Sequence, residues 1–437
     1  MQIGGGVAGR AGFVDRGAPV PLAGLATVGF LGLAAGTQMS DRGIQAILLP
    51  AIKASFAVGD GTIGALQGMA GILVASALAV PLARIADRVS RKRILLALIA
   101  AWGVLTAISA VAPSFPLFFI GRAASGVTEF AMIPVVYSLI PDLVDERWRV
   151  NANLAFAALM ATGASAGFYF GGAFVDLAVG LGGADVMPGA LEPWRRVLLL
   201  LSLAAIPLLL LGLLTVDPPR GREEGSDATA ATLAAFVRAQ WRSILLFVGT
   251  AGGLAIAVQS LTPMIAMALE RRFAVGIGPI GHALGIITLV TSVACLPLAG
   301  VVDRALRLRF GARSRPLVMA TMAIASIPCA VAMGFAADER SALVLVTIFL
   351  FLTCTANALI PTMLQDLAPA SLRARSFATY SFVIAVFCAL GPVLSGNLSD
   401  RVFEGDLLTA IGASAAPSLA LAAGCAALSV IALAPRR

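Results

Sequence analysis

A short charged motif occurs twice in this chain, about half a chain length apart. Residues 81–88 read PLARIADR and residues 297–304 read PLAGVVDR, in a chain of 437 residues. In both copies an apolar stretch ends in Asp-Arg and is followed by further basic residues. Because each copy joins an apolar helix to a charged loop, a repeat of this length predicts two similar bundles of membrane-spanning helices.

The composition argues against a water-soluble globular protein. Hydrophobic residues make up 59% of the chain and charged residues 12%, whereas soluble domains carry about 25% charged residues. The net charge of +8 could indicate nucleic-acid binding. The basic residues lie in short loops between apolar runs, however, so we expect no nucleic-acid partner. The five cysteines lie in apolar segments without metal-ligand spacing, and we expect neither a metal nor a cofactor.

Twelve segments are long and apolar enough to span a lipid bilayer, which takes about 20 residues in a helix. Only structures that satisfy their own backbone hydrogen bonds can cross lipid, so we predict an all-α integral membrane fold with two pseudo-symmetric six-helix bundles. The predicted spans lie near residues 22–52, 62–83, 94–112, 116–141, 151–180, 195–216, 242–269, 280–302, 316–336, 341–366, 374–399 and 408–434.

The domain organisation follows from these spans. Most Lys and Arg residues lie on the side that holds both termini, and the positive-inside rule places that side in the cytoplasm. Prolines and a charge cluster after the sixth span mark a linker between the bundles. We expect a cytoplasmic tail (1–20), an N-terminal bundle (21–216), a cytoplasmic linker able to form an amphipathic helix (217–241) and a C-terminal bundle (242–437).

The loop after the second span carries a recognisable signature. The run from Asp87 to Arg93, DRVSRKR, resembles the signature loop between spans 2 and 3 of the major facilitator superfamily. The family has glycine where this chain has Ala83 and Ser90, but the spacing of the charges is the same. This resemblance covers nearly the whole chain and implies a secondary transporter that works by alternating access, not an enzyme.

Three further places resemble the spinster family of lipid transporters and its bacterial members. They are Asp41-Arg42 in span 1, Arg122-x-x-x-Gly126-x-x-Glu129 in span 4, and Asp217-Pro218-Pro219-Arg220-Gly221 after span 6. The chain departs from the family at Thr37-Gln38, where Asn-Tyr is usual, and at Thr128, where glycine is usual. The span 4 pattern is shared with organic-anion symporters.

The resemblance implies a function and leaves one alternative open. We expect a monomeric transporter in a bacterial cytoplasmic membrane that moves a lysophospholipid or sphingoid phosphate together with protons. The alternative is a proton-coupled symporter of small organic anions. An enzyme is disfavoured because His282 is the only histidine and no hydrolytic constellation is present.

Four charged residues lie deep inside the predicted spans: Asp41, Arg42, Arg122 and Glu129. A charge at the centre of a bilayer costs several kcal/mol unless it is paired or faces water, so such residues are candidate functional residues. Burial favours the neutral form of a carboxyl group, which makes Glu129 and Asp41 candidate proton sites. The planar guanidinium of Arg122 suits a carboxylate or phosphate, and Arg42 completes the charge network. The alternative is that these charges only hold helices together.

The second half differs chemically from the first. Its spans hold no Lys or Arg well away from their ends, and Gln259, Asn357 and Tyr380 are its candidate cavity residues. We therefore expect this half to present an apolar wall to an acyl chain.

The duplicated loop motif is a candidate conformational gate. By resemblance, such a loop locks the two halves together when the outer side is open. The residues concerned are Asp87, Arg88 and Arg91 in the first copy, and Asp303 and Arg304 in the second.

Overall fold

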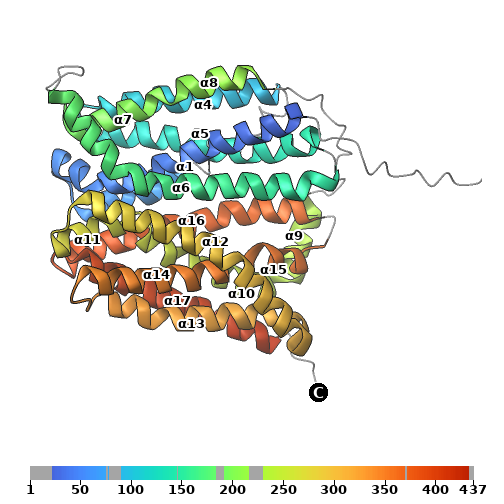
Figure 1. Ribbon diagram of the computed structural model, residues 1–437. Helices are drawn as coiled ribbons and strands as arrows, with labels where there is room; N and C mark the ends of the chain where they lie inside the picture. Colours follow the sequence, from blue (N-terminus) through green and yellow to red (C-terminus); the bar gives the residue numbers. More distant parts are fainter. Residues whose placement is uncertain are drawn as a thin grey trace, which may run out of the picture.

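The computed structural model describes residues 22–74, 77, 90–144, 146–183, 191–215, 230–369 and 372–432. Within these ranges the chain is helical and contains no strand. The helices run roughly side by side in two bundles, and the first described helix begins at the same end of the molecule at which the last one ends (Figure 1). We call this end the termini end and the opposite end the distal end.

The first half of the chain forms one bundle. Its second span begins as an α-helix and continues as a π-helix, η1. The elements of this half are α1 (Leu22–Phe56), α2 (Asp60–Ala65), η1 (Leu66–Val74), α4 (Arg91–Ala110), α5 (Phe115–Leu143), α6 (Glu146–Gly183), α7 (Pro193–Leu203) and α8 (Ala205–Leu213).

The second half forms the other bundle, preceded by a short helix in the predicted linker, α9 (Ala230–Ala239). The remaining elements are α10 (Trp241–Leu261), α11 (Ile265–Phe273), α12 (Ile277–Phe310), η2 (Gly311–Arg313), α13 (Ser314–Met333), α14 (Glu339–Asn357), α15 (Ile360–Leu367), α16 (Arg373–Arg401) and α17 (Leu407–Ala432).

Three predicted spans are interrupted in the structure, and a proline lies in or just after each interruption. A proline cannot donate the helical hydrogen bond to the residue four positions before it. Helix α7 ends four residues before Pro207, and α14 ends four residues before Pro361. Pro263 lies in the break between α10 and α11. Continuous helices were expected here, because apolar composition alone does not show where a span bends.

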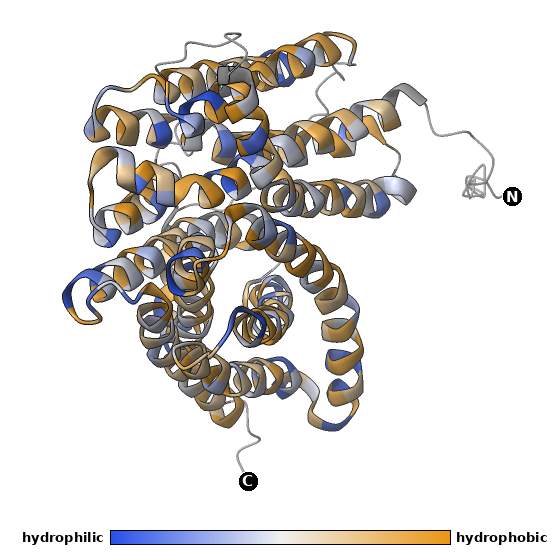
Figure 2. Cartoon of the chain, turned by 60° about the vertical axis from the view of Figure 1, so that its left-hand side comes forward, coloured by the Kyte–Doolittle hydropathy of each residue, from blue (hydrophilic) through white to orange (hydrophobic). Residues whose placement is uncertain are grey.

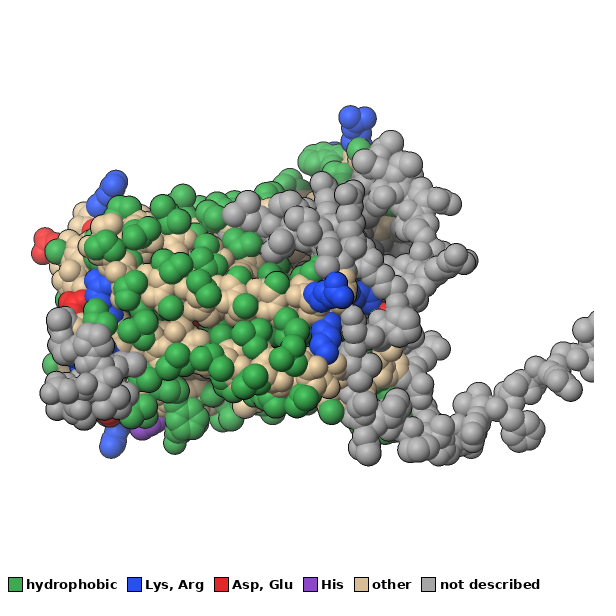
Figure 3. Space-filling view, turned by 90° about the horizontal axis from the view of Figure 1, so that it is seen from above, with side chains coloured by type: hydrophobic (Ala, Val, Ile, Leu, Met, Phe, Trp, Pro, Cys, Tyr) green, Lys and Arg blue, Asp and Glu red, His purple; other side chains and the backbone are tan. Residues whose placement is uncertain are grey.

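The surface has the pattern of a membrane protein. Apolar side chains cover the middle of the molecule, and charged side chains gather toward its two ends (Figure 3). Coloured by hydropathy, the helices are mostly apolar along their lengths, with hydrophilic residues concentrated in the connections (Figure 2). Among the described residues, nine stretches are long and apolar enough to cross a membrane by length and composition, one of them running through α12 and α13. Helix α1 is not among them, and it carries Asp41 and Arg42 in its middle.

Glycines allow very close packing of α1 against α6. A Cβ atom added at Gly163 would lie 2.1 Å from the carbonyl oxygen of Gly36, and one at Gly167 would lie 2.2 Å from that of Ser40. Both neighbours are backbone atoms, so no side-chain movement could make room. These two glycines therefore set the distance between α1, which carries two of the four deep charges, and α6.

The two bundles meet mainly where α6 packs on α12 and where α2 and η1 pack on α16, and α1 also contacts α11. Helix α6 packs on α12, where the Ser165 hydroxyl donates a hydrogen bond to the Gly285 carbonyl at 2.8 Å. Helix α2 and η1 pack on α16, where a Cβ added at Gly64 would lie 2.1 Å from the Pro392 carbonyl oxygen. Both sets of contacts bring backbones together without intervening side chains.

We predict that Gly163→Ala destabilises the fold, because the new methyl group overlaps the backbone of α1. The free energy of unfolding should fall by about 1–3 kcal/mol, the usual cost of overpacking. Gly180, on the same helix, is the control, since a Cβ there meets nothing within 4 Å. Thermal unfolding in detergent measures both variants. Equal stability of the two would contradict the proposed role of Gly163.

Candidate functional site

A cavity of about 200 Å³ lies between the two bundles. Its walls come from α1, η1, α5 and α6 of the first half and from the α10–α11 region and α12 of the second. The polar residues that line it are Arg42, Gln45, Gln67, Arg122, Glu129, Gln259, Thr262 and Thr288.

Asp41 is held behind the cavity wall by an ion pair. It is fully buried in the middle of α1. Its Oδ2 atom accepts hydrogen bonds from Trp102 Nε1 of α4 and from Arg122 Nη2 of α5, both at 3.0 Å. Arg122 Nη2 also donates to Gln45 Oε1 at 3.2 Å. The Asp41–Arg122 pair therefore ties together α1, α4 and α5 and fixes the position of Arg122.

Arg42 and Glu129 form a second ion pair, at the cavity surface. The distance from Arg42 Nε to Glu129 Oε2 is 2.8 Å. The Glu129 side chain is 2% exposed, while that of Arg42 is 37% exposed. The guanidinium of Arg42 also lies over the ring of Phe130, with Cζ 4.8 Å from the ring centroid. Both members of this pair line the cavity, so a cation and an acid touch where a substrate would enter.

The structure thus brings all four predicted charges together, as two pairs rather than one cluster. Successive residues on an α-helix point about 100° apart. Asp41 consequently faces α4 and α5, while its neighbour Arg42 faces the cavity. The pairing partner of Glu129 is Arg42 and not Arg122.

Several buried polar atoms near these pairs have no hydrogen-bond partner among the described residues. They include both amide atoms of Gln38, the Ser125 hydroxyl, Gln67 Nε2, and Nε and Nη1 of Arg122. Buried polar groups are normally satisfied by protein, water or ligand. Arg122 thus retains donors beyond those it gives to Asp41 and Gln45.

The second half contributes mainly polar groups to the cavity, with Pro263 as its one apolar residue among the described lining residues. Gln259 lines it as expected, together with Thr262 and Thr288. Tyr380 instead packs on Phe247, with ring centroids 5.4 Å apart, and Asn357 is the last residue of α14. Neither is among the described residues that line the cavity. The large apolar side chains that line the cavity all belong to the first half: Met39, Leu66, Ile72 and Phe168. The apolar wall was expected in the second half and lies in the first.

At the termini end, the described gate residues pair within their own half. Arg91 donates to Asp142, both in the first half. Asp303 accepts hydrogen bonds from Ser314 and Arg315, and Arg315 also donates to Asp366, all in the second half. Arg304 is exposed. Asp87 and Arg88 lie outside the described residues.

At the distal end, a buried carboxylate that the sequence analysis missed joins the two halves. Asp60, the first residue of α2, is fully buried. It accepts hydrogen bonds from Arg271 Nη1 at 2.6 Å and Nη2 at 2.8 Å, and from the Ser399 hydroxyl at 2.6 Å, all from the second half. Lys53 of the first half donates to it at 2.5 Å. The sequence placed Asp60 just before the predicted second span, where an acidic residue is common and points to no particular role.

Other contacts surround Asp60. The carboxylate of Asp400 accepts hydrogen bonds from the backbone N–H groups of Asp60 and Gly61, at 2.9 and 2.7 Å. Arg271 Nη1 also donates to the carbonyl of Gly405 at 2.7 Å, and the φ angle of +91° at Gly405 suits glycine. These contacts tie the ends of α11 and α16 to the start of α2.

Asp60 remains ionised at physiological pH. Burial opposes its charge, but hydrogen bonds from Arg271, Lys53 and Ser399 outweigh burial and lower its pKa from 3.8 to about 2. A carboxylate with a lowered pKa stabilises the folded protein above its unfolded pKa and loses that contribution as the pH falls toward its folded pKa. The contribution of Asp60 is therefore complete above about pH 4 and is lost as the pH falls toward 2.

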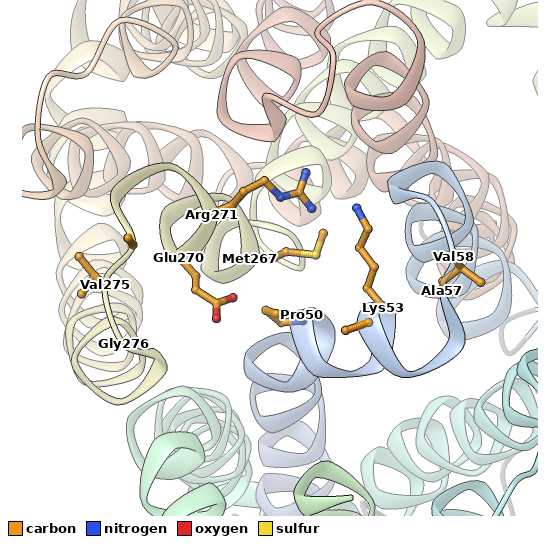
Figure 4. A pocket seen from close by; sticks show the side chains of 11 residues that line it. Pro50, Lys53, Ala57, Val58, Met267, Glu270, Arg271, Val275 and Gly276 are labelled. Atoms are coloured by element: carbon orange, nitrogen blue, oxygen red, sulfur yellow. The ribbon is translucent and has the colours of Figure 1, made fainter.

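An open cavity of about 690 Å³ lies beside Asp60 at the distal end (Figure 4). Residues of both halves line it, including Pro50 and Lys53 of α1 and Met267, Glu270 and Arg271 of α11. Figure 4 shows the side-chain ends of Lys53 and Arg271 directed toward each other across this cavity, with the carboxylate of Glu270 between α11 and Pro50. Burial raises the pKa of Glu270, and the nearby Arg271 opposes that shift.

Among the described residues, no group of three or more His, Cys, Asp or Glu side chains is placed to hold a metal ion.

Comparisons with known proteins identify the family. The family model described as Major Facilitator Superfamily matches residues 31–392. An MFS-type efflux pump of Mycolicibacterium smegmatis is 24% identical over 389 residues, which cover 87% of this chain and 85% of the pump. Protein spinster homolog 1 of Rattus norvegicus is 29% identical over 392 residues, which cover 83% of this chain and 70% of that protein.

Solved structures show the same fold. A bacterial homolog of the human lysosomal transporter Spinster, in an inward-facing and unoccupied conformation, matches with a TM-score of 0.79 and 19% identity over 95% of this chain and 98% of that one. A D-xylose–proton symporter matches with a TM-score of 0.65 and 14% identity over 91% of this chain and 97% of that one. With a family match over most of its length and this fold, the chain belongs to the major facilitator superfamily of transporters, and within it resembles the spinster proteins.

Proposed function

We propose that this transporter moves an anionic amphipathic lipid, such as a lysophospholipid or sphingoid phosphate, together with protons. The observation that carries the proposal is the Arg42–Glu129 pair at the wall of the central cavity. Arg42 can bind an anion and Glu129 can bind a proton. When neither ligand is present, the two side chains pair with each other.

The two fluxes would be coupled through competition for Arg42. A protonated Glu129 no longer holds the guanidinium, which is then available to a phosphate or carboxylate of the substrate. Loss of the proton restores the pair and expels the anion. The sequence alone suggested that the anion competes for Arg122. The contact between Glu129 and Arg42 supports Arg42 in that role, with Arg122 held by Asp41 and adding its remaining donors.

A second candidate is a small organic anion. The polar groups that the second half places in the cavity, Gln259, Thr262 and Thr288, favour a compact polar substrate. The apolar residues of the first half, together with the likeness to Protein spinster homolog 1, favour a lipid chain. The two candidates share an anionic group at Arg42 and differ in whether an acyl chain contributes to binding.

We propose a bacterial cytoplasmic membrane location, a monomer, and cytoplasmic termini. The basic residues of the termini end support this orientation through the positive-inside rule. In that orientation the distal end faces outward. We also propose that Asp87, Arg88 and Arg91 engage Asp303 and Arg304 when the termini end closes. Arg91 pairs with Asp142 and Asp303 pairs with Arg315, each within its own half.

We predict that Glu129→Gln abolishes the pH dependence of transport, because glutamine mimics the protonated acid at all pH values. Uptake of a fluorescent lysophospholipid into proteoliposomes, with and without an imposed pH gradient, measures this effect. Glu339→Gln, at the start of α14 and outside the cavity lining, is the control and should behave like the parent. An unchanged response to the gradient in Glu129→Gln would remove Glu129 from the coupling mechanism.

We predict that Arg42→Gln weakens binding of the anionic substrate about 10- to 100-fold, the loss expected for one charge-assisted hydrogen bond of about 1.5–3 kcal/mol. Competition assays against labelled lysophospholipid measure affinity, with small carboxylates tested in parallel. Arg340→Gln, in the first turn of α14 and outside the cavity lining, is the matched control. Equal affinity of Arg42→Gln and parent would exclude Arg42 as the anion site, and competition by small carboxylates alone would favour the second candidate.

A further inference from the structure

The ion pairs of the distal end fall into two classes. Arg271–Asp60, at 2.6 Å, joins a residue of the second half to one of the first. Arg272–Asp406, at 3.0 Å, lies next to it in the chain but stays within the second half. Only pairs of the first class must separate when the two bundles move apart at this end.

We infer that Asp60 is the lock that holds the distal end closed, and that Lys53 is the partner that Asp60 keeps when this end opens. The inference concerns residues that the sequence analysis did not identify, and it depends neither on the nature of the substrate nor on protons.

The hydrogen bonds of Asp60 explain the lock. Three of them come from Arg271 and Ser399 of the opposite half, and all three are lost if α2 moves away from α11 and α16. Asp400 would also lose the backbone N–H groups of Asp60 and Gly61. Removing one partner of a buried ion pair is far more costly than removing an exposed one. The closed state therefore depends strongly on the Arg271–Asp60 contact.

Lys53 explains how the lock can open. It lies on α1, seven residues before Asp60 and in the same half, so the Lys53–Asp60 pair moves as one unit. The carboxylate then keeps a cation in the open state instead of being left without one. Arg271 likewise keeps the carbonyl of Gly405, which belongs to its own half. The opening movement thus exchanges a three-group ion cluster for a simple ion pair on the first half.

Arg271 and Lys53 pair with the same carboxylate, Asp60, but replacing them should have different effects on the opening of the distal end. Arg271→Gln weakens only the closed state, because Arg271 is absent from Asp60 in the open state. Lys53→Gln leaves Arg271 in place in the closed state and deprives Asp60 of its partner in the open state. The first should favour opening and the second should not.

The test measures the distance across the distal cavity. The five native cysteines are first replaced, and spin labels are then attached through Ala54→Cys and Val275→Cys, on opposite walls of the cavity. Pulsed electron spin resonance of the purified full chain in nanodiscs, without substrate and at pH 7.5, gives the populations of short and long distances. We expect Asp60→Asn and Arg271→Gln to raise the ratio of long to short distances at least about 10-fold.

Two controls make the result specific. Lys53→Gln and Asp406→Asn should give no more of the long distance than the parent does. The lock is refuted if Arg271→Gln keeps the parent distribution, and the role of Lys53 is refuted if Lys53→Gln opens the distal end as far as Arg271→Gln does. The distances of Asp60→Asn are interpreted only if this variant elutes as a monodisperse species. If Asp60→Asn does not, the distances of Arg271→Gln alone test the lock. These distances are measured without substrate and at one pH. The lock can therefore be refuted without refuting the proposed transport function, and the transport function can be refuted without refuting the lock.

Discussion

Charge pairing inside an apolar bundle is the constraint on which the functional site depends. A lone charge at this depth would cost several kcal/mol, and removal of one partner of a buried pair costs about 3–5 kcal/mol. The four deep charges meet this constraint as Asp41–Arg122 and Arg42–Glu129, so the site is electrically neutral. A neutral site can accept a proton and an anion together without acquiring net charge. Pairing thus links the stability of the bundle to the transport of two ligands.

The two pairs differ in accessibility, which separates their roles. Asp41 has two side-chain donors on its Oδ2 atom and no exposed surface, so it is suited to position Arg122. Arg42 reaches the cavity and pairs with an acid that can be neutralised by a proton. The distal end repeats the same logic with Asp60, whose two cations come from different halves. In the two proposals, Glu129 releases Arg42 when it is protonated, and Asp60 releases Arg271 while keeping Lys53.

Much of the fold was accessible from sequence, and less of the site was. The spans follow from apolar length, and the duplicated bundle follows from the repeat, because both depend on local composition. The breaks before Pro263 and Pro361 were missed, although proline chemistry accounts for them. The pairing of Glu129 with Arg42 depends on the rotation of α1 relative to α5, which a one-dimensional pattern does not contain. Asp60 was missed because its partners are 211 and 339 residues away.

The internal repeat shows which of these contacts belong to the architecture. Arg91 and Asp142 form an ion pair at the termini end of the first half, and Arg315 and Asp366 form one in the second. Both residues of the second pair follow their counterparts by 224 positions. The deep charges have no such counterpart, since the described residues of the second half that line the cavity, Gln259, Thr262, Pro263 and Thr288, are all uncharged. Pairs preserved in both halves therefore serve each bundle separately. The coupling that we propose depends instead on the charges that only the first half carries.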